Sequence, residues 1–267
     1  MKEVLLQSLK LGGETLMGYF GKIESFRVKE SQSSIVTQAD LESERRVVDC
    51  NLQNFPDHNV IAEETGFRWN GSEYTWIVDP LDGTSNFAAG LPWFGVLVAV
   101  LRNFEPVAAG MYLPFYDQRY LAAKGEGATR NGQPVRVSPE TSLKNVLLAY
   151  SLDYSADFTK TAAETGIIGD VVRHVRNLRA TNSAVDFCYV ADGRLGGCVN
   201  QTTSLWDIAA PWLVIRDREA GGVCTDIHGQ EIDFEVDAAT YGRNFTVIAA
   251  NPVLHGEIRQ LVSRHLP

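Results

Sequence analysis

The chain has 267 residues, of which 45% are hydrophobic and 21% charged, and this balance excludes an intrinsically disordered protein. A formal net charge of -9 without a basic run argues against general nucleic-acid binding, because phosphate backbones are bound by clustered Lys and Arg. The length allows one large core built from one or two subdomains.

The sequence indicates a protein outside membranes and in a reducing compartment. No segment reaches the roughly 18 apolar residues that a membrane-spanning helix requires. The first 20 residues carry Glu3 and Glu14 and lack a small-residue cleavage site, which is untypical of a secretory leader. The scattered cysteines are Cys50, Cys188, Cys198 and Cys224. Because they lack metal-type spacing, we expect reduced, mostly buried thiols in a cytoplasmic protein.

The first half of the chain is predicted to pass from helices to strands. Helical periodicity covers residues 1–20 and about 39–54, and apolar runs of strand length with turns between them follow. Strands are expected at 60–62, 76–78, 94–101, 107–112, 120–123 and within 128–137. The last of these contains Asn131-Gly132, which is a strong hairpin signal.

The second half alternates between the two kinds of element. Strands are expected at 146–150, 195–199, 222–226 and 245–250, and helices at 160–175, 182–192, from Asp207 onward and after Asn251-Pro252. The polar segment 138–146 predicts a boundary between residues 1–140 and residues 141–267 as two subdomains. Periodicity alone therefore predicts a mixture of α and β structure and no particular architecture.

The most informative stretch is WIVDPLDGTSNF, from Trp76 to Phe87. An apolar run ends in Asp79 and Asp82 and then turns through a glycine into a hydroxyl residue. Two carboxylates about 4 Å apart repel by about 4 kcal/mol when partly shielded from water, and a divalent cation with oxygen ligands would relieve that repulsion. Taken alone, however, Asp-x-x-Asp-Gly is also typical of an ordinary turn.

Three further acid sites favour the metal interpretation. Glu63-Glu64 follows a short apolar strand, Asp207 opens a long apolar segment, and Asp40 lies near the hydroxyl of Thr37. Asp207 taken singly is equally an acid that complements a helix dipole, and Asp40 is equally a helix cap. Together, in this order and with these flanks, the acids predict a metal-dependent hydrolase.

Three segments of the chain resemble the signatures of the inositol monophosphatase family. They are Glu63-Glu64-Thr65, the stretch from Asp79 to Phe87, and the stretch from Trp206 to Gly222. The similarity extends over almost the whole chain. It implies an α+β fold, namely the layered α-β-α-β-α sandwich of inositol monophosphatases and fructose-1,6-bisphosphatases. It also implies a lithium-sensitive homodimer with two or three Mg²⁺ ions per subunit.

The resemblance implies a set of metal ligands. Glu63, Asp79 and the carbonyl of Leu81 would hold the first magnesium ion. Asp79, Asp82 and Asp207 would hold the second, with Asp79 shared between the ions. These are hard oxygen ligands, which magnesium prefers.

The resemblance also implies the catalytic groups. Thr84 would orient the attacking water while Asp40 holds its hydroxyl, and Glu63 would accept the proton of that water. Gly83 and Thr84 would open a helix whose free N–H groups bind the phosphate. Glu64 is expected to support the site without binding the metal directly. No histidine is needed, and all five are expected to be structural or at the surface.

The alcohol half of the substrate is the open question. Asn200 stands where the family usually carries a glutamate that binds polyol hydroxyls, and an amide cannot offer a charge-assisted bond there. Ser183 and Asn182 would face this pocket or simply cap a helix, and Lys29 would close over the site or remain solvated.

The substrate is expected to be a small phosphate monoester, by default an inositol monophosphate. Histidinol phosphate, fructose 1,6-bisphosphate and a 3′-phosphoadenosine nucleotide are alternatives with the same chemistry. A regulatory binding protein on the same fold is a third interpretation, against which the intact acid ligands argue. Neither nucleic acid nor a membrane is expected as a partner.

Overall fold

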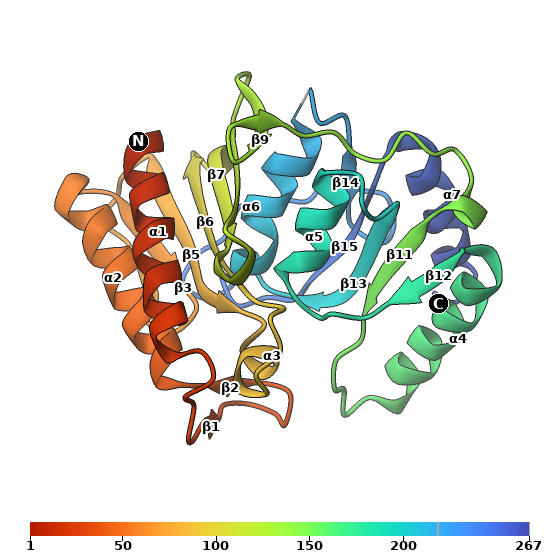
Figure 1. Ribbon diagram of the computed structural model, residues 1–267, viewed down its shortest axis with the longest axis horizontal. Coiled ribbons are helices and arrows are strands. Elements are labelled where there is room, and N and C mark those ends of the chain that lie inside the picture. Colours follow the sequence, from red (N-terminus) through yellow and green to blue (C-terminus); the bar gives the residue numbers. More distant parts are fainter. Residues whose placement is uncertain (218, 267) are drawn as a thin grey trace.

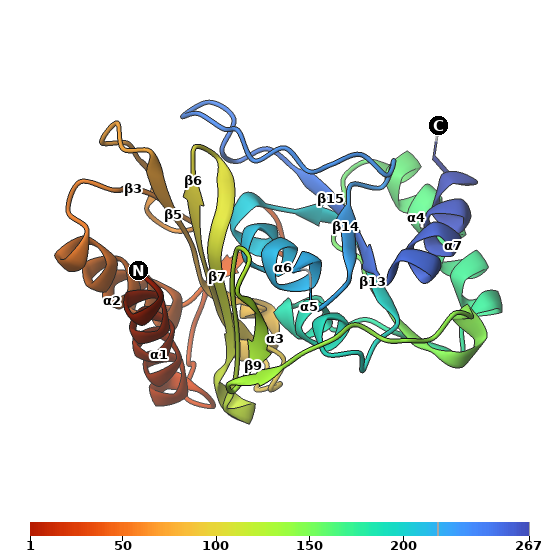
Figure 2. The same ribbon diagram turned by 90° about the horizontal axis from the view of Figure 1, so that it is seen from above.

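Helices and sheets alternate in five layers in the computed structural model, which describes residues 1–217 and 219–266. Figures 1 and 2 show the order helix, sheet, helix, sheet, helix across the molecule. The outer helices on one side are α1 (Lys2–Tyr19) and α2 (Gln38–Asn54), and on the other side α4 (Phe158–His174) and α7 (Pro252–Ser263). The middle layer holds α5 (Ala184–Ala191) and α6 (Leu205–Arg216). The predicted layered sandwich is confirmed.

The first sheet has eight strands in the order β10-β9-β8-β7-β6-β5-β3-β4. They are β3 (Asn59–Ala62), β4 (Gly66–Arg68), β5 (Tyr74–Asp82), β6 (Gly95–Arg102), β7 (Glu105–Leu113), β8 (Gln118–Ala123), β9 (Gly127–Arg130) and β10 (Gln133–Pro134). All neighbours are antiparallel except β3 and β5. The predicted hairpin is present, and its residues Asn131 and Gly132 both have positive φ, at 49° and 78°.

The second sheet has five strands in the order β12-β11-β13-β15-β14. They are β11 (Leu147–Ser151), β12 (Asn177–Arg179), β13 (Gly197–Thr203), β14 (Val223–Thr225) and β15 (Phe245–Ala250). The strands β11 and β13 run parallel, with Ser151 paired to Asn200. The segments that follow these two strands therefore leave the sheet at the same edge.

Four short strands were not predicted. A ribbon of β1 (Arg27–Val28) and β2 (Ile35–Val36) lies apart from both sheets, and β4 and β12 lie at sheet edges. Each has only two or three residues, which is too short for a period of two to be recognised. The short helix α3 (Thr84–Ala88) begins where the sequence predicted a helix, and one-turn 3₁₀ helices cover Pro114–Tyr116 and Leu143–Asn145.

The helix α6 explains why the layers hold together. Eight of its twelve residues are buried, so it is apolar around most of its circumference, as expected for a helix between two sheets. Its core includes side chains from both sheets, such as Leu97 of β6 and Val247 of β15. The two predicted halves share this core, and their division at residue 140 stays a prediction.

The four cysteines are buried and free of disulfide bonds, as predicted. Within the described ranges, every helix falls short of the length and apolar character needed to cross a lipid bilayer.

Candidate active site

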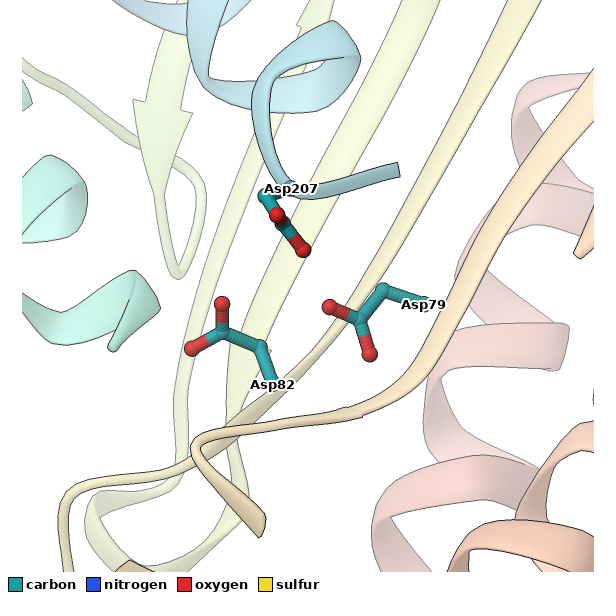
Figure 3. Close-up of side chains that lie close together, drawn as sticks. All are labelled: Asp79, Asp82 and Asp207. Atoms are coloured by element: carbon teal, nitrogen blue, oxygen red, sulfur yellow. The ribbon is translucent and has the colours of Figure 1, made fainter. Parts of the chain in front are cut away.

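A bulge at the end of β5 brings Asp79 and Asp82 to one side of the sheet. On a regular strand, residues three positions apart point to opposite faces. Here Asp79 pairs with Leu97 and Asp82 with Gly95, so β5 fits one extra residue between two partner positions on β6. Pro80 lies in this bulge, where the missing N–H breaks no ladder bond. Both carboxylates consequently face the same hollow (Figure 3).

Asp207 reaches the same hollow from the first turn of α6. Its Oδ2 accepts the N–H of Ser204 at 2.6 Å and the hydroxyl of Thr203 at 2.9 Å, which caps the helix. Capping uses Oδ2, so the carboxylate can serve as cap and as ligand at once. Asp79, Asp82 and Asp207 each offer an oxygen within 4.8 Å of the others (Figure 3).

Burial is the main cause that raises the pKa of these three carboxyl groups. The charges of neighbouring acids raise the pKa of Asp79 and Asp82 further, while an N–H bond from Ala184 at the start of α5 opposes the rise at Asp82. For Asp207 the bonds from Ser204 and Thr203 lower the pKa without cancelling the effect of burial. Three converging acids of this kind fit a small divalent cation with oxygen ligands.

Glu63 lines the same hollow but lies outside the group of three. It follows β3 directly, and its N–H donates to the carbonyl of Val78 at 3.1 Å, beside Asp79 on the parallel strand β5. Burial raises the pKa of Glu63 to about 8, although the charge of Lys29 opposes this rise. Glu63, which the family resemblance predicts as ligand and proton acceptor, therefore lies at the border of the acid group.

Lys29, on the loop between β1 and β2, contacts two glutamates at the pocket and is not simply solvated. Its Nζ donates to Glu63 at 2.7 Å and to Glu64 at 2.8 Å. Burial acts to lower the pKa of Lys29, but the charges of both glutamates outweigh it and hold that pKa above its ordinary value. The loop between β1 and β2 thus places a positive charge beside Glu63 and Glu64.

Two side chains of α2 that the sequence analysis did not single out hold the strand ends in place. Glu44 accepts the N–H groups of Glu64 and Thr65, each at 2.8 Å, and Ser43 donates to the carbonyl of Pro80 at 2.8 Å. Both are buried on the face of α2 that also carries Asp40. In the sequence they share one face of the predicted helix with Asp40, at spacings of three and four, but only the packing of α2 shows that this face is buried.

The predicted contact between Thr84 and Asp40 is present. The Thr84 hydroxyl lies 2.9 Å from Asp40 Oδ1 and 2.9 Å from the carbonyl of Leu81, and its single hydrogen can serve one of these acceptors at a time. Asp40 Oδ2 accepts the N–H and hydroxyl of Thr37 at 2.8 and 2.6 Å. Asp40 therefore caps α2 and reaches Thr84 with its other oxygen, so its two interpretations are compatible.

Gly83 makes the turn from β5 into α3 possible. Its φ is +84°, and a Cβ there would lie 2.5 Å from the carbonyl oxygen of Trp93. Only glycine fits this position without strain. The first N–H groups of α3 have no acceptor within the helix, and Thr84 and Ser85 line the hollow.

The site is a pocket of about 1240 Å³ lined by the loop between β1 and β2, the end of β5, the strand β13 and the starts of α5 and α6. Of the predicted site residues, all but Asp40 line it, and Asp40 is buried behind Thr84. Ser183 both lines the pocket and caps α5, and Asn200 lines it from the middle of β13. The sequence analysis missed the lining residues Asp153, Tyr154, Thr202 and Tyr241, which belong to no local motif. No described histidine lines the pocket.

The chain is similar to known proteins along nearly its whole length. The sequence profile of the inositol monophosphatase family matches residues 1–266. A fructose-1,6-bisphosphatase/inositol-1-monophosphatase of Aquifex aeolicus is 35% identical, with 96% of this chain and 92% of that protein covered. The Nus factor SuhB of Pasteurella multocida is 31% identical, with 82% of each covered. The crystal structure of SuhB from Bartonella henselae has a TM-score of 0.89 and 27% identity, and covers 99% of this chain and 98% of that one.

Proposed function

This chain belongs to the inositol monophosphatase family, and we propose that it is a magnesium-dependent phosphatase that hydrolyses a small phosphate monoester. The observation that carries the proposal is the convergence of Asp79, Asp82 and Asp207 on one hollow. Asp79 is buried, Asp82 and Asp207 are half-buried, and among the described residues no Lys or Arg pairs with them; Lys29 pairs with Glu63 and Glu64 instead. A bound metal would stabilise the charged forms of the three aspartates.

The proposed ligands are the three aspartates together with Glu63 and the carbonyl of Leu81. All are oxygen donors, as magnesium requires, and the open pocket leaves room for water and a phosphate. Bound magnesium would supply positive charge that polarises the phosphoryl group and makes water more acidic. The number of ions, two or three, stays a prediction.

The residues of the chain would then prepare the water for attack. With its hydrogen donated to Asp40, the Thr84 oxygen presents lone pairs that accept a proton of the water and fix its direction. Glu63 is the proposed proton acceptor, since its carboxylate lines the same pocket as Thr84 and the three aspartates. The unpaired N–H groups at Gly83 and Thr84 would bind a phosphoryl oxygen, because helix starts favour anions.

The default substrate is an inositol monophosphate. The name of the Aquifex aeolicus relative adds support for fructose 1,6-bisphosphate as an alternative. Histidinol phosphate and a 3′-phosphoadenosine nucleotide stay as predictions with the same chemistry. The homodimer, the cytoplasmic location and the lithium sensitivity expected from the sequence stay predictions as well.

A second candidate is a regulatory protein that acts by binding a partner. It is favoured by one observation, the similarity to a relative named Nus factor SuhB. The complete acid set supports the phosphatase over a purely regulatory role, because converging carboxylates without a paired cation are costly and a catalytic metal would offset that cost.

Phosphate release tests the proposal. The purified chain is incubated with a panel of phosphate monoesters, once with Mg²⁺ and once with a chelator. We expect Mg²⁺-dependent turnover of at least one ester. Failure to hydrolyse any ester in the presence of Mg²⁺ would favour the regulatory candidate.

A further inference from the structure

The part of the pocket lined by β13 and by the loop between β11 and α4 carries a single charged side chain, Asp153. It lies on the loop between β11 and α4, two residues beyond Ser151, which is paired with Asn200 across the parallel strands. Asp153, Asn200 and Thr202 line this wall together. The other charged residues that line the described pocket are Lys29 and Glu30 of the β1–β2 loop and the proposed metal ligands Glu63, Asp79, Asp82 and Asp207.

The position of Asp153 is fixed by Asn182. The Asn182 side chain accepts the N–H of Leu152 at 3.3 Å and donates to its carbonyl at 2.9 Å, which clamps the turn. The same amide donates to Asp153 Oδ1 at 3.2 Å. Asn182 itself has a φ of +49°, a left-handed conformation that asparagine tolerates better than most residues. Among the described residues no group donates to Asp153 Oδ2, which leaves that oxygen for a ligand.

Asn200 offers the complementary donor. Its Oδ1 accepts the N–H of Thr202 at 2.9 Å, so its amide hydrogens stay available to the pocket. The Thr202 hydroxyl accepts a bond from Lys160 at 2.6 Å, and Lys160 lies behind Thr202 without lining the pocket. A free carboxylate oxygen beside an amide donor suits a hydroxyl group, which donates one hydrogen bond and accepts another.

We propose that Asp153 determines specificity for the alcohol half of the substrate. It accepts a charge-assisted hydrogen bond from a hydroxyl of a neutral polyol, and its negative charge repels a second phosphate. The inference rests on the proposed function and narrows it to monophosphates of neutral polyols, at the expense of sugar bisphosphates. A carboxylate from the loop after β11 would thus do what the amide at Asn200 cannot.

The test compares Asp153→Asn with Asp157→Asn. Asp157 belongs to the same loop, where it caps α4 by accepting the N–H of Thr159 at 2.8 Å, but it is exposed and does not line the pocket. Both variants lose one charge from the same segment. For each, kcat and KM are measured with myo-inositol 1-phosphate, fructose 1,6-bisphosphate and 4-nitrophenyl phosphate, always with Mg²⁺.

Asp153→Asn is expected to lower kcat/KM for myo-inositol 1-phosphate by about 10- to 100-fold, the usual cost of losing a hydrogen bond to a charged group. It is expected to raise kcat/KM for fructose 1,6-bisphosphate by about 3- to 10-fold, because a like-charge contact is removed. The nitrophenyl ester, which has neither group, should change least. Asp157→Asn should leave the ratio of kcat/KM for myo-inositol 1-phosphate to kcat/KM for fructose 1,6-bisphosphate as it is in the parent protein.

Asn182→Ala sharpens the same test. Releasing the clamp should shift the ratio in the same direction as Asp153→Asn but by a smaller factor, since the carboxylate is still present. An equal loss on all three esters in Asp153→Asn would assign Asp153 a structural role and overturn the inference. Histidinol phosphate serves as a fourth ester. The neutral-polyol assignment would be overturned if the parent protein preferred histidinol phosphate to the inositol ester and Asp153→Asn abolished that preference.

The inference can fail separately from the proposed function. Absence of turnover with every ester would refute the phosphatase, and the esters would then remain intact for titration calorimetry with the same variants. The titrations give the ratio of the dissociation constants for the inositol ester and the bisphosphate. A shift of at least about threefold in this ratio in Asp153→Asn supports the inference. An unchanged ratio contradicts it.

Discussion

The two walls of the pocket differ in how their charged groups are held. On the metal wall, Asp79, Asp82 and Asp207 each accept a backbone N–H, from Leu81, Ala184 and Ser204 respectively. On the alcohol wall, Asp153 is half-buried and is held by the side chain of Asn182. Backbone donors persist whatever side chains the chain carries, whereas Asn182 can be exchanged. The chemistry is thus built into the fold, and the choice of alcohol rests on replaceable residues.

The largest expected effect comes from Asp82→Asn on the metal wall. Turnover should fall by about a thousandfold, because a charged ligand to the metal is lost and its charge stabilisation is worth several kcal/mol. The same variant should raise the Tm of the metal-free protein, since one of several repelling buried acids becomes neutral. Steady-state kinetics and thermal unfolding with a chelator measure the two effects.

Asp49→Asn, an exposed change on α2, is the matched control and should affect neither property. Near-normal turnover in Asp82→Asn would contradict the assignment of Asp82 as a metal ligand, and with it the difference drawn between the two walls. A metal-free Tm that falls would instead mean that Asp82 stabilises the fold as an ordinary hydrogen-bond acceptor.

The second prediction concerns the hydroxyl of Thr84. Thr84→Val should lower kcat by about 10²-fold or more, because the water loses the acceptor that directs it while the metal ligands stay in place. Thr84→Ser keeps the hydroxyl and should recover most of this loss. If the Thr84→Ser and Thr84→Val variants are equally impaired, Thr84 acts by packing, and its contact with Asp40 stabilises the structure without directing the water.

The third prediction concerns pH. Burial raises the pKa of Glu63 from 4.5 to about 8, so between these values the folded protein binds more protons than the unfolded chain. The free energy of unfolding of the metal-free protein should therefore fall as pH rises through this window, by up to about 1.4 kcal/mol per pH unit for each such group. Asp79 and Asp82 shift in the same direction and add to the effect.

Magnesium should reverse this trend, because it binds the deprotonated acids. The rise in Tm on adding Mg²⁺ should therefore grow from pH 5 to pH 8, as thermal melts with and without a chelator can measure. An increment that is the same at every pH would show that these carboxyl groups do not release protons to the metal.

The smallest expected effect is inhibition by lithium, which the family resemblance implies. Millimolar lithium should slow turnover by acting on the metal wall, and Asp153→Asn should be inhibited to the same degree as the parent protein. Activity assays with and without lithium measure this. Insensitivity at these concentrations would weaken the assignment of the second metal site, and a changed response in Asp153→Asn would show that the walls are coupled.

The acids that the sequence singled out lie next to strand ends and helix starts, and the structure brings them to one pocket. Asp79 and Asp82 share one motif, Glu63 follows an apolar strand, and Asp207 opens a helix, so local signals located each residue. What local signals could not provide is the bulge in β5, which turns Asp79 and Asp82 to the same side. The bulge depends on pairing with β6, a contact between distant parts of the chain.

The alcohol wall was largely missed for the same reason. Asp153 and Tyr241 lie in loops, far apart in sequence, and come to line the same pocket as Asn200 only when the sheets and their connections pack. Ser43 and Glu44 were missed although their spacing on α2 was visible, because polar residues on a helix are ordinarily assigned to its solvent face. Their burial follows from the packing of α2 against the first sheet.

The most direct test of the central claim is a crystal structure of the chain soaked with Mn²⁺, which substitutes for magnesium and scatters X-rays anomalously. The account predicts an anomalous peak among the carboxylates of Asp79, Asp82 and Asp207, at coordination distance from all three. A saturating soak that leaves this position without a peak, or that places the metal elsewhere, would contradict the claim that these acids form a metal centre.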